Sequence, residues 1–130
     1  MPTVKTSQTK HRYDLERKTQ QLDATGQTVG RLSTKIAGLL MGKHKVAYSP
    51  QTDCGDAVEV ANVSQLKFTG KKFDQKKYYH YSGYQGGLKT KKLKDVFTTD
   101  PEDVLRRAVS QMLPKNKLRD EIIKRLTFHA

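Results

Sequence analysis

The chain has 130 residues, enough for one domain with a single core, and its 25 Lys and Arg against 13 Asp and Glu give a formal net charge of +12. Only 35% of the residues are hydrophobic, no apolar run approaches the roughly 18 residues of a membrane-spanning helix, and a single cysteine excludes an internal disulfide. We therefore expect a soluble intracellular protein with a small core, whose charge attracts nucleic acid or, as a second choice, an anionic membrane surface.

The chain is expected to begin with a polar, basic arm over residues 1–20, because this stretch has neither a helical nor a strand period. It lacks the apolar centre of a secretory signal, while an organelle transit segment stays open because such segments are basic and rich in Ser and Thr. Residues 21–130 are expected to form a single α/β domain. That domain starts with a short strand end at Leu22 and a turn at Thr25–Gly26.

A first helix is predicted between Thr28, its N-cap, and Gly42, which closes it at the C-terminal end. Its apolar residues recur at helical spacing on one face and are Val29, Leu32, Ile36, Leu39 and Leu40. The opposite face carries Arg31 and Lys35, four residues apart. A basic turn, Lys43–Lys45, follows the helix directly.

Two short strands are expected next, over residues 55–63, which alternate in polarity, and over residues 66–69. The carboxylates Asp53 and Asp56 lie beside the turn before the first of these strands. We interpret them as turn-forming residues and not as a catalytic pair, because aspartate side chains commonly bond the backbone two residues on.

Two further helices are predicted in the C-terminal third. The first has Asp100 as N-cap, Pro101 at its first position and acids in its first turn, and Pro114 ends it. The second spans residues 118–126, and residues 127–128 form a closing strand. Strands that alternate with helices, without a tight hairpin signal, favour an α/β layered domain.

The most unusual segment is KKYYHYSGYQGGLKTKK, residues 76–92, which holds five lysines, four of the six tyrosines and no acid. It is expected to be an irregular loop, because its second half is rich in glycine. Lysine neutralises phosphate, a tyrosine ring stacks on an unpaired base for about 1–3 kcal/mol, and glycine lets the backbone approach closely. We therefore predict nucleic-acid contact here, with a merely solvated loop as the alternative.

No catalytic, metal or cofactor site emerges from the sequence. Residues 26–31 match neither the dinucleotide-binding glycine pattern nor the phosphate-binding loop. The four histidines show no zinc-ligand spacing, and nothing marks an activating base for Cys54. An RNA- or nucleotide-acting enzyme on an α/β scaffold stays as the alternative function. An adaptor for anionic membranes is weaker, because no helix pairs a basic face with bulky aromatic anchors.

Five stretches, taken together, resemble the ribosomal protein L13 family of the large subunit. In the family's order they are DATGQTVGRLSTKIAGLLMGKHKVAYSP, DCGDAVEVANV, FTGKK, KKYYHYSGYQGGLK and AVSQMLPKNKL, and they cover most of residues 22–126. The chain departs from the family at residues 19–22, where the first strand is therefore expected to be short or frayed. It departs again at Gln85, which replaces a frequent proline and is expected to loosen the loop.

The resemblance implies a single three-layer domain with a short, mainly parallel, four-stranded sheet, helices on both faces, a basic N-terminal arm and an RNA-binding loop. It implies a non-enzymatic constituent of the large ribosomal subunit that binds large-subunit ribosomal RNA, supports assembly and translation, and contacts neighbouring large-subunit proteins. Its own messenger RNA is left open as a second target. The expected location is the cytoplasmic ribosome, with an organellar ribosome left open.

The residues expected to contact RNA are basic, aromatic or glycine residues and one serine, and all except Lys91 and Lys92 lie in the matched stretches. They are Arg31, Lys35, Lys43, His44, Lys45, Lys71, Lys72, Lys76, Lys77, Tyr78, Tyr79, His80, Tyr81, Ser82, Gly83, Tyr84, Gly86, Gly87, Lys89, Lys91, Lys92, Lys115 and Lys117.

Overall fold

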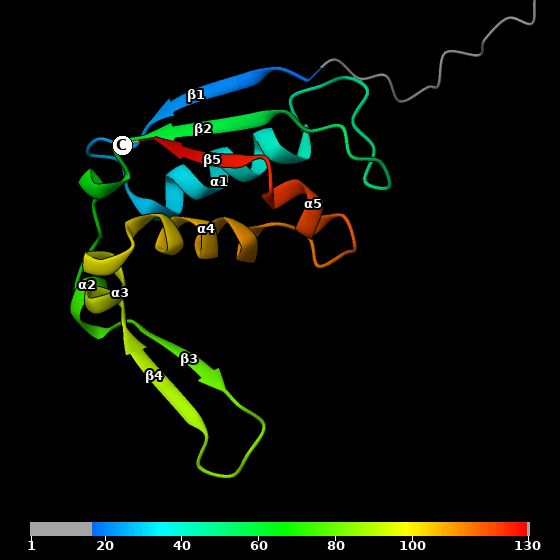
Figure 1. Cartoon of the computed structure of the whole chain (residues 1–130). Coiled ribbons are helices and arrows are strands. Elements are labelled where there is room, and N and C mark those ends of the chain that lie inside the picture. Colours follow the sequence, from blue (N-terminus) through cyan, green and yellow to red (C-terminus); the bar gives the residue numbers. More distant parts are fainter. Residues whose placement is uncertain (1–16, 130) are drawn as a thin grey trace, which may run out of the picture.

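A computed structural model describes residues 17–129 of the chain (Figure 1). Most of the expected N-terminal arm, residues 1–16, lies outside this range, and Thr19 and Gln20 already belong to the first strand. In chain order the elements are β1 (Thr19–Asp23), α1 (Val29–Met41), β2 (Ala57–Ala61), a 3-10 turn (Val63–Gln65), α2 (Lys72–Gln75), β3 (Lys77–Tyr81), β4 (Leu88–Lys92), α3 (Leu93–Thr99), α4 (Pro101–Met112), α5 (Arg119–Ile123) and β5 (Leu126–His129).

The main sheet is parallel, with the strand order β1-β2-β5. Parallel neighbours need long crossover connections, and helix α1 supplies the one between β1 and β2. The expected α/β class with a parallel sheet is confirmed. Strand β1, which we expected to be short or frayed, pairs with β2 along its whole length, from Thr19 opposite Ala57 to Asp23 opposite Ala61.

The sheet has three strands in the described part of the chain, not the expected four. Residues 66–69, predicted as a strand, make one isolated parallel bridge, between Thr28 and Lys67. The reason is the turn that follows β2: Asn62 has a left-handed backbone (φ 58°) and leads into the 3-10 turn. The chain then passes the start of α1 instead of running along β1.

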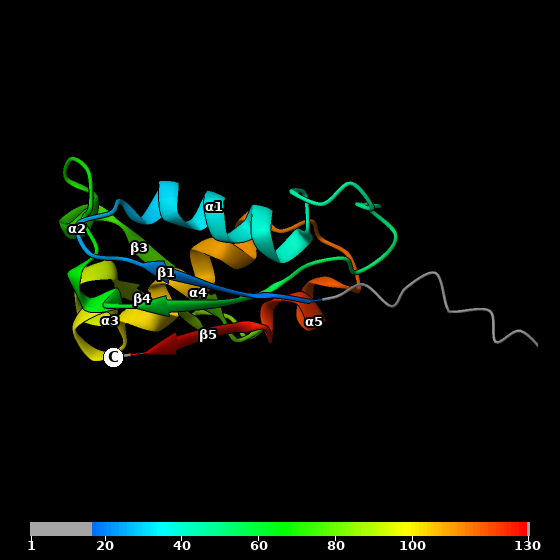
Figure 2. The same ribbon diagram turned by 90° about the horizontal axis from the view of Figure 1, so that it is seen from above.

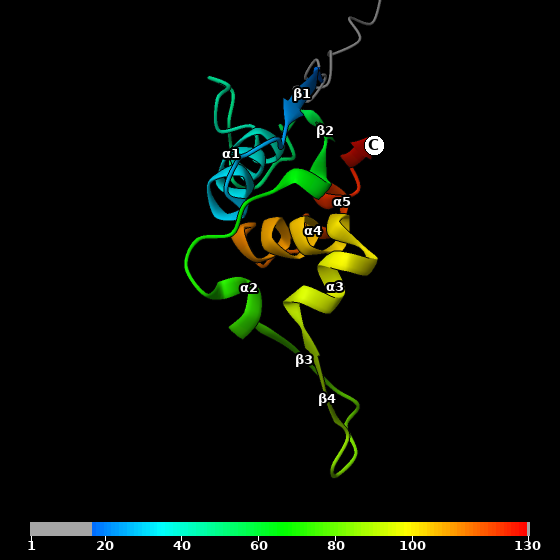
Figure 3. The ribbon, with the colours of Figure 1, turned by 90° about the vertical axis from the view of Figure 1, so that its left-hand side faces the viewer.

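Helices α1, α4 and α5 lie on one face of this sheet, and in the described residues no helix covers the other, so the expected cover on both faces is not seen there (Figures 1 and 3). From above, the strands lie in front of α4 (Figure 2). The side chains that face the helices are buried or half-buried and apolar: Leu22, Val58, Val60, Leu126 and Phe128. Those that alternate with them are mostly polar: Thr19, Gln21, Glu59, Thr127 and His129. A helix on that second face would bury polar side chains, which is unfavourable.

The predicted limits of α1 are confirmed. Thr28 is its N-cap, although its side chain makes no capping hydrogen bond within the described residues, and Gly42 ends the helix with a left-handed backbone (φ 77°). A Cβ atom at Gly42 would lie 2.6 Å from the carbonyl oxygen of Cys54, so glycine is required there for space as well as for conformation. Residues Leu32, Ile36 and Leu40 of the predicted stripe are fully buried.

Helix α4 also begins as predicted, because the Asp100 side chain accepts a hydrogen bond from the backbone nitrogen of Asp103 at 3.1 Å. The helix after it is shorter than predicted: α5 ends at Ile123, since Leu126 already starts β5. Helix α3 was not expected. It has only two buried residues, Leu93 and Val96, which is too short an apolar pattern to show a helical period.

The expectation of an irregular loop over residues 76–92 was wrong. Strands β3 and β4 pair antiparallel with Tyr79 opposite Thr90, and the hairpin extends away from the domain (Figures 1 and 3). The glycines lie in the connection, residues 82–87, while tyrosine and threonine, which favour strands, lie in β3 and β4. The connection is longer than a two-residue turn, which is why no tight hairpin signal appears in the sequence.

Candidate nucleic-acid interface

The hairpin has two chemically different faces, because paired residues of an antiparallel ribbon point to the same side. One face combines Tyr79, Tyr81 and Leu88, whose exposed fractions are 65%, 59% and 56%. These three large exposed apolar groups, next to Lys77 and Lys92 at the base of the same face, form a surface on which flat rings can stack.

The other face of the hairpin is basic and combines His80, Lys89 and Lys91 with Tyr78. Tyr78 is half-buried, and burial raises the pKa of its phenol. The Lys76 ammonium lies 5.4 Å and the Arg107 guanidinium 5.1 Å from the centre of its ring. The Arg107 contact joins the base of the hairpin to α4, whereas the Lys76 contact is local to the hairpin base.

The connection between β3 and β4 presents Tyr84, which is 80% exposed. Gly83 (φ 89°) and Gly86 (φ 72°) have left-handed backbones, as expected for this segment. Backbone amides in such a turn can face phosphate oxygens. The predicted tyrosines, lysines and glycines of residues 76–92 therefore lie together on one projecting ribbon.

The basic turn Lys43–Lys45 is organised by a carboxylate that the sequence assigned to a turn. Asp56 is fully buried and accepts hydrogen bonds from Lys45 Nζ at 2.5 Å, His44 Nε2 at 2.8 Å and the backbone nitrogen of Lys18 at 3.1 Å. Burial opposes ionisation of Asp56, but these hydrogen bonds outweigh it and hold its pKa well below the usual range. His44 and Lys45 thus carry a structural role besides any contact with RNA, whereas Lys43 is exposed.

Asp53 is likewise more than a turn residue, although its Oδ1 also accepts a long hydrogen bond from the backbone nitrogen of Gly55. Its carboxylate pairs with the Arg125 guanidinium through both oxygens, with Nη2 donating to Oδ1 at 2.6 Å. Burial raises the pKa of Asp53 and Arg125 lowers it, with a net lowering. Sequence reasoning missed this contact, because its partners are 72 residues apart.

The remaining predicted cations fall into three places. Lys71 and Lys72 are exposed at the start of α2. Arg31 and Lys35 lie on the exposed face of α1, and Lys115 and Lys117 lie in the exposed turn between α4 and α5. That turn borders a groove of about 300 Å³, which is also lined by Lys43 and by residues 48–50 and 52. The turn between α4 and α5 lies away from the strands of the hairpin (Figure 1), so the structure does not bring all predicted residues into one site.

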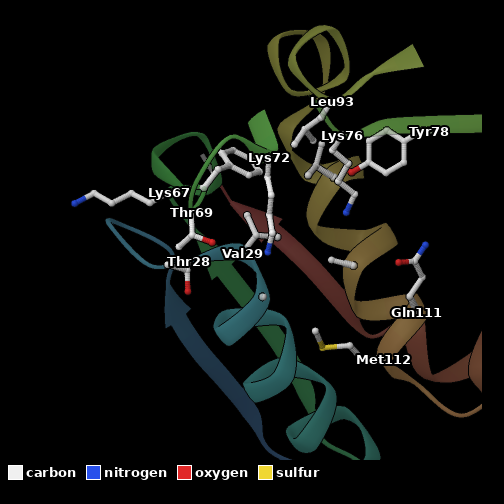
Figure 4. Close-up of a pocket in the computed structure, with 14 residues that line it drawn as sticks. Thr28, Val29, Lys67, Thr69, Lys72, Lys76, Tyr78, Leu93, Gln111 and Met112 are labelled. Atoms are coloured by element: carbon white, nitrogen blue, oxygen red, sulfur yellow. The ribbon is translucent and has the colours of Figure 1, made fainter. Parts of the chain in front are cut away.

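A second cleft, of about 210 Å³, lies where the start of α1, α2, α4 and the base of the hairpin meet (Figure 4). It is lined by the predicted cations Lys72 and Lys76 together with Gln111 and Met112 of α4, which the sequence did not single out. A cleft made by four elements leaves no local pattern, so only the packed structure shows it.

Within residues 17–129 no three His, Cys, Asp or Glu side chains are grouped so as to hold a metal ion. In the same range no helix is long and apolar enough to cross a membrane.

The comparisons with known proteins agree with one another. A family model described as ribosomal protein L13 matches residues 17–130. The chain is 51% identical over 113 residues to the large ribosomal subunit protein uL13 of Aquifex aeolicus, covering 87% of this chain and 78% of the relative. The same protein of Clostridioides difficile is 48% identical over 117 residues, covering 90% and 82%. That of Thermotoga maritima is 46% identical over 129 residues, covering 99% and 86%.

Proposed function

This chain belongs to the ribosomal protein L13 family, and on that premise we propose that it is a structural protein of the large ribosomal subunit. It takes part in translation as a component of the particle and not as an enzyme. Its place is the ribosome of the cytoplasm.

Its partner is large-subunit ribosomal RNA, and the observation that carries this is the hairpin of residues 77–92. The ribbon exposes tyrosines and leucine on one face and lysines on the other. In the isolated protein these apolar side chains stay in contact with water and the lysines repel one another, so neither face stabilises the fold. The ribbon suits irregular RNA, in which phosphates need cations and unpaired bases need flat surfaces. Lys43, Lys115 and Lys117 supply a second point of phosphate contact, away from the hairpin strands.

The α/β core acts as a rigid spacer between these two contacts. Phosphate contacts fix position and register, while stacking selects unpaired bases. Neighbouring large-subunit proteins are further partners, and the protein's own messenger RNA is a second target if it presents a similar irregular fold. The basic arm that we propose ends before Thr19, because Thr19 and Gln20 pair with β2 as part of the domain.

The binding mechanism is tested by replacing Lys76, Lys77, Lys89 and Lys91 together with glutamine. The slope of log affinity against log salt is negative, and each phosphate that is no longer neutralised is expected to reduce its magnitude by about 0.7–0.9. The variant therefore binds ribosomal RNA more weakly and with less salt dependence. A filter-binding titration across salt concentrations measures both. An unchanged slope would remove the hairpin from the interface.

Membership in the particle is tested separately, by sedimenting a cell lysate through a sucrose gradient and probing the fractions for the protein. Co-migration with large subunits that persists in moderate salt is the expected result. A peak among small soluble species would contradict the proposed function.

A further inference from the structure

The cleft of about 210 Å³ between α1, α2, α4 and the hairpin base has the dimensions of a site for one small group (Figure 4). Pockets for drug-sized ligands measure about 300–1,000 Å³, so this cleft admits one ring system and not an extended molecule.

The floor of the cleft is apolar. It is formed by residues of three helices and of the segment before α2, namely Val29, Phe68, Leu93, Val104, Ala108 and Met112. Met112 is 42% exposed although it lies among these side chains. Leu93 and Val104 are already buried, so a flat ring that entered the cleft would remove from water the exposed surface of the other four residues, which is favourable at about 25 cal/mol per Å².

The mouth of the cleft is cationic. Figure 4 shows the side chains of Lys72 and Lys76 reaching over it, while the Lys67 ammonium points away. Among the residues that the structure describes, no Asp or Glu lines the cleft. An occupant must therefore combine a flat apolar group with negative charge.

The cleft continues into a shallower one that follows the hairpin. This second hollow, of about 430 Å³, shares Lys76, Tyr78 and Gln111 with the first and adds Lys77 and Arg107. Arg107 is paired with Asp103 at 2.7 Å, but Lys76 and Lys77 are exposed. A basic track thus leads from the cleft toward the hairpin strands, as a polyanionic chain would require.

We propose that the cleft holds one nucleotide extruded from the RNA strand that the hairpin binds, with the base on the apolar floor and the flanking phosphates at Lys72 and Lys76. This rests on the proposed RNA-binding function and adds to it a specific subsite. A base linked to phosphates on both sides is the group that combines a flat ring with negative charge and continues along the track. Because only an unpaired base can enter, the cleft selects a bulge or a splayed loop.

The test fills the cleft from α1. Gly30 lines it and is exposed, and a Cβ atom there would have no atom within 4 Å apart from its own helix backbone and chain neighbours, so Gly30→Leu starts a side chain at the cleft from an open position. Gly38→Leu is the matched control, because Gly38 lies in the same helix, also has an open Cβ position, and does not line the cleft. Both replacements raise helix propensity.

The three proteins are bound to transcribed large-subunit ribosomal RNA, which is then probed nucleotide by nucleotide with dimethyl sulfate and a 2′-hydroxyl acylating reagent. Wild type and Gly38→Leu are expected to change the reactivity of one unpaired nucleotide that Gly30→Leu leaves unchanged, while all three keep the protections made by the hairpin. Gly30→Leu is expected to bind about 5- to 150-fold more weakly, the loss of one stacked base.

A wild-type pattern with Gly30→Leu would overturn the subsite and leave the proposed function standing. Absence of any protection by the wild-type protein would overturn both. A free mononucleotide that binds saturably, with loss in Gly30→Leu but no difference in the RNA pattern, would overturn it in favour of a free-nucleotide site.

A second pair of variants decides the matter if Gly30→Leu fails to fold. Lys72→Gln changes the mouth of the cleft, and Lys94→Gln removes the same charge from an exposed position of α3 that does not line it. The proposal requires that Lys72→Gln weaken the change at the single nucleotide and that Lys94→Gln preserve it. Equal effects of the two would overturn the subsite.

Discussion

Arg125, two residues after α5, holds the carboxylate of Asp53 from 72 residues away, with Nη2 2.6 Å from Oδ1, and its Nη2 also donates to the carbonyl oxygen of Leu40 at 3.2 Å. The contact joins the segment after α1 to the segment before β5. Both side chains are only about one-sixth exposed, at 15% and 17%. The pair therefore closes the end of the domain that carries the basic turn.

Arg125→Ala is expected to lower the free energy of unfolding by about 3 kcal/mol. Without Arg125, the largely buried carboxylate of Asp53 keeps only its longer contact to Arg17, at 3.4 Å, as an ion pair. Arg125→Lys keeps the charge and loses the two-point geometry, so its effect is smaller. Urea denaturation of the three proteins measures the order. An unchanged midpoint for Arg125→Ala would show that the pair does not stabilise the fold.

Acid is expected to destabilise the protein through Asp56. Its pKa is lower in the folded protein than its value of 3.8 in the unfolded chain, so the unfolded chain takes up the proton first. The stability that Asp56 contributes is complete well above pH 3.8 and is lost as the pH falls below it toward the folded pKa. Asp53 acts in the same direction.

Urea midpoints measured between about pH 7 and about pH 2.5 test this dependence. Asp56→Asn is expected to be less stable near neutral pH and to lose less on acidification than wild type. Asp74→Asn is the control, because Asp74 is exposed in α2. Parallel pH curves for wild type and Asp56→Asn would contradict the assignment.

The two faces of the hairpin are expected to contribute differently to RNA binding. Replacing Tyr79 and Tyr81 with alanine removes stacking, so affinity falls by about 1–3 kcal/mol per stacked base while the salt slope stays constant. Replacing Lys89 and Lys91 with glutamine makes that slope shallower, by about 0.7–0.9 for each phosphate that the variant no longer neutralises.

Filter binding at several salt concentrations separates these effects. All four residues are exposed, so neither double variant is expected to change stability by more than about 0.5 kcal/mol per site. Equal changes of the salt slope in both variants would contradict the assignment of stacking to the tyrosine face and of phosphate neutralisation to the lysine face.

Glycine positions within and after α1 are expected to respond in opposite directions to alanine. Gly42→Ala puts a Cβ into a left-handed conformation and 2.6 Å from the oxygen of Cys54, and is expected to cost about 2 kcal/mol or more. Gly38→Ala, in the helix interior with an open Cβ position, is expected to stabilise by about 0.5–1 kcal/mol. Thermal unfolding of both variants measures the difference, and a neutral Gly42→Ala would contradict the close approach.

Local sequence determined the elements whose signals lie within a few residues. The limits of α1 at Thr28 and Gly42 and the start of α4 at Asp100 and Pro101 follow from caps and fixed backbone angles, which act over one turn of helix. The motif KKYYHYSGYQGGLK, with the others, was enough to indicate the family, because residue types in a fixed order need no knowledge of their contacts.

Tertiary structure alone decided the features that depend on distant partners. The hairpin formed despite its glycine-rich connection, because β3 and β4 pair with each other and Tyr78 packs against α4. Residues 66–69 did not become a fourth strand, because the turn after β2 directs them to the start of α1. Asp53 and Asp56 were taken for turn residues, since the cations that hold them lie from 11 to 72 residues away in sequence. Burial and ion pairing are set by which segments meet in space, and that information is not local.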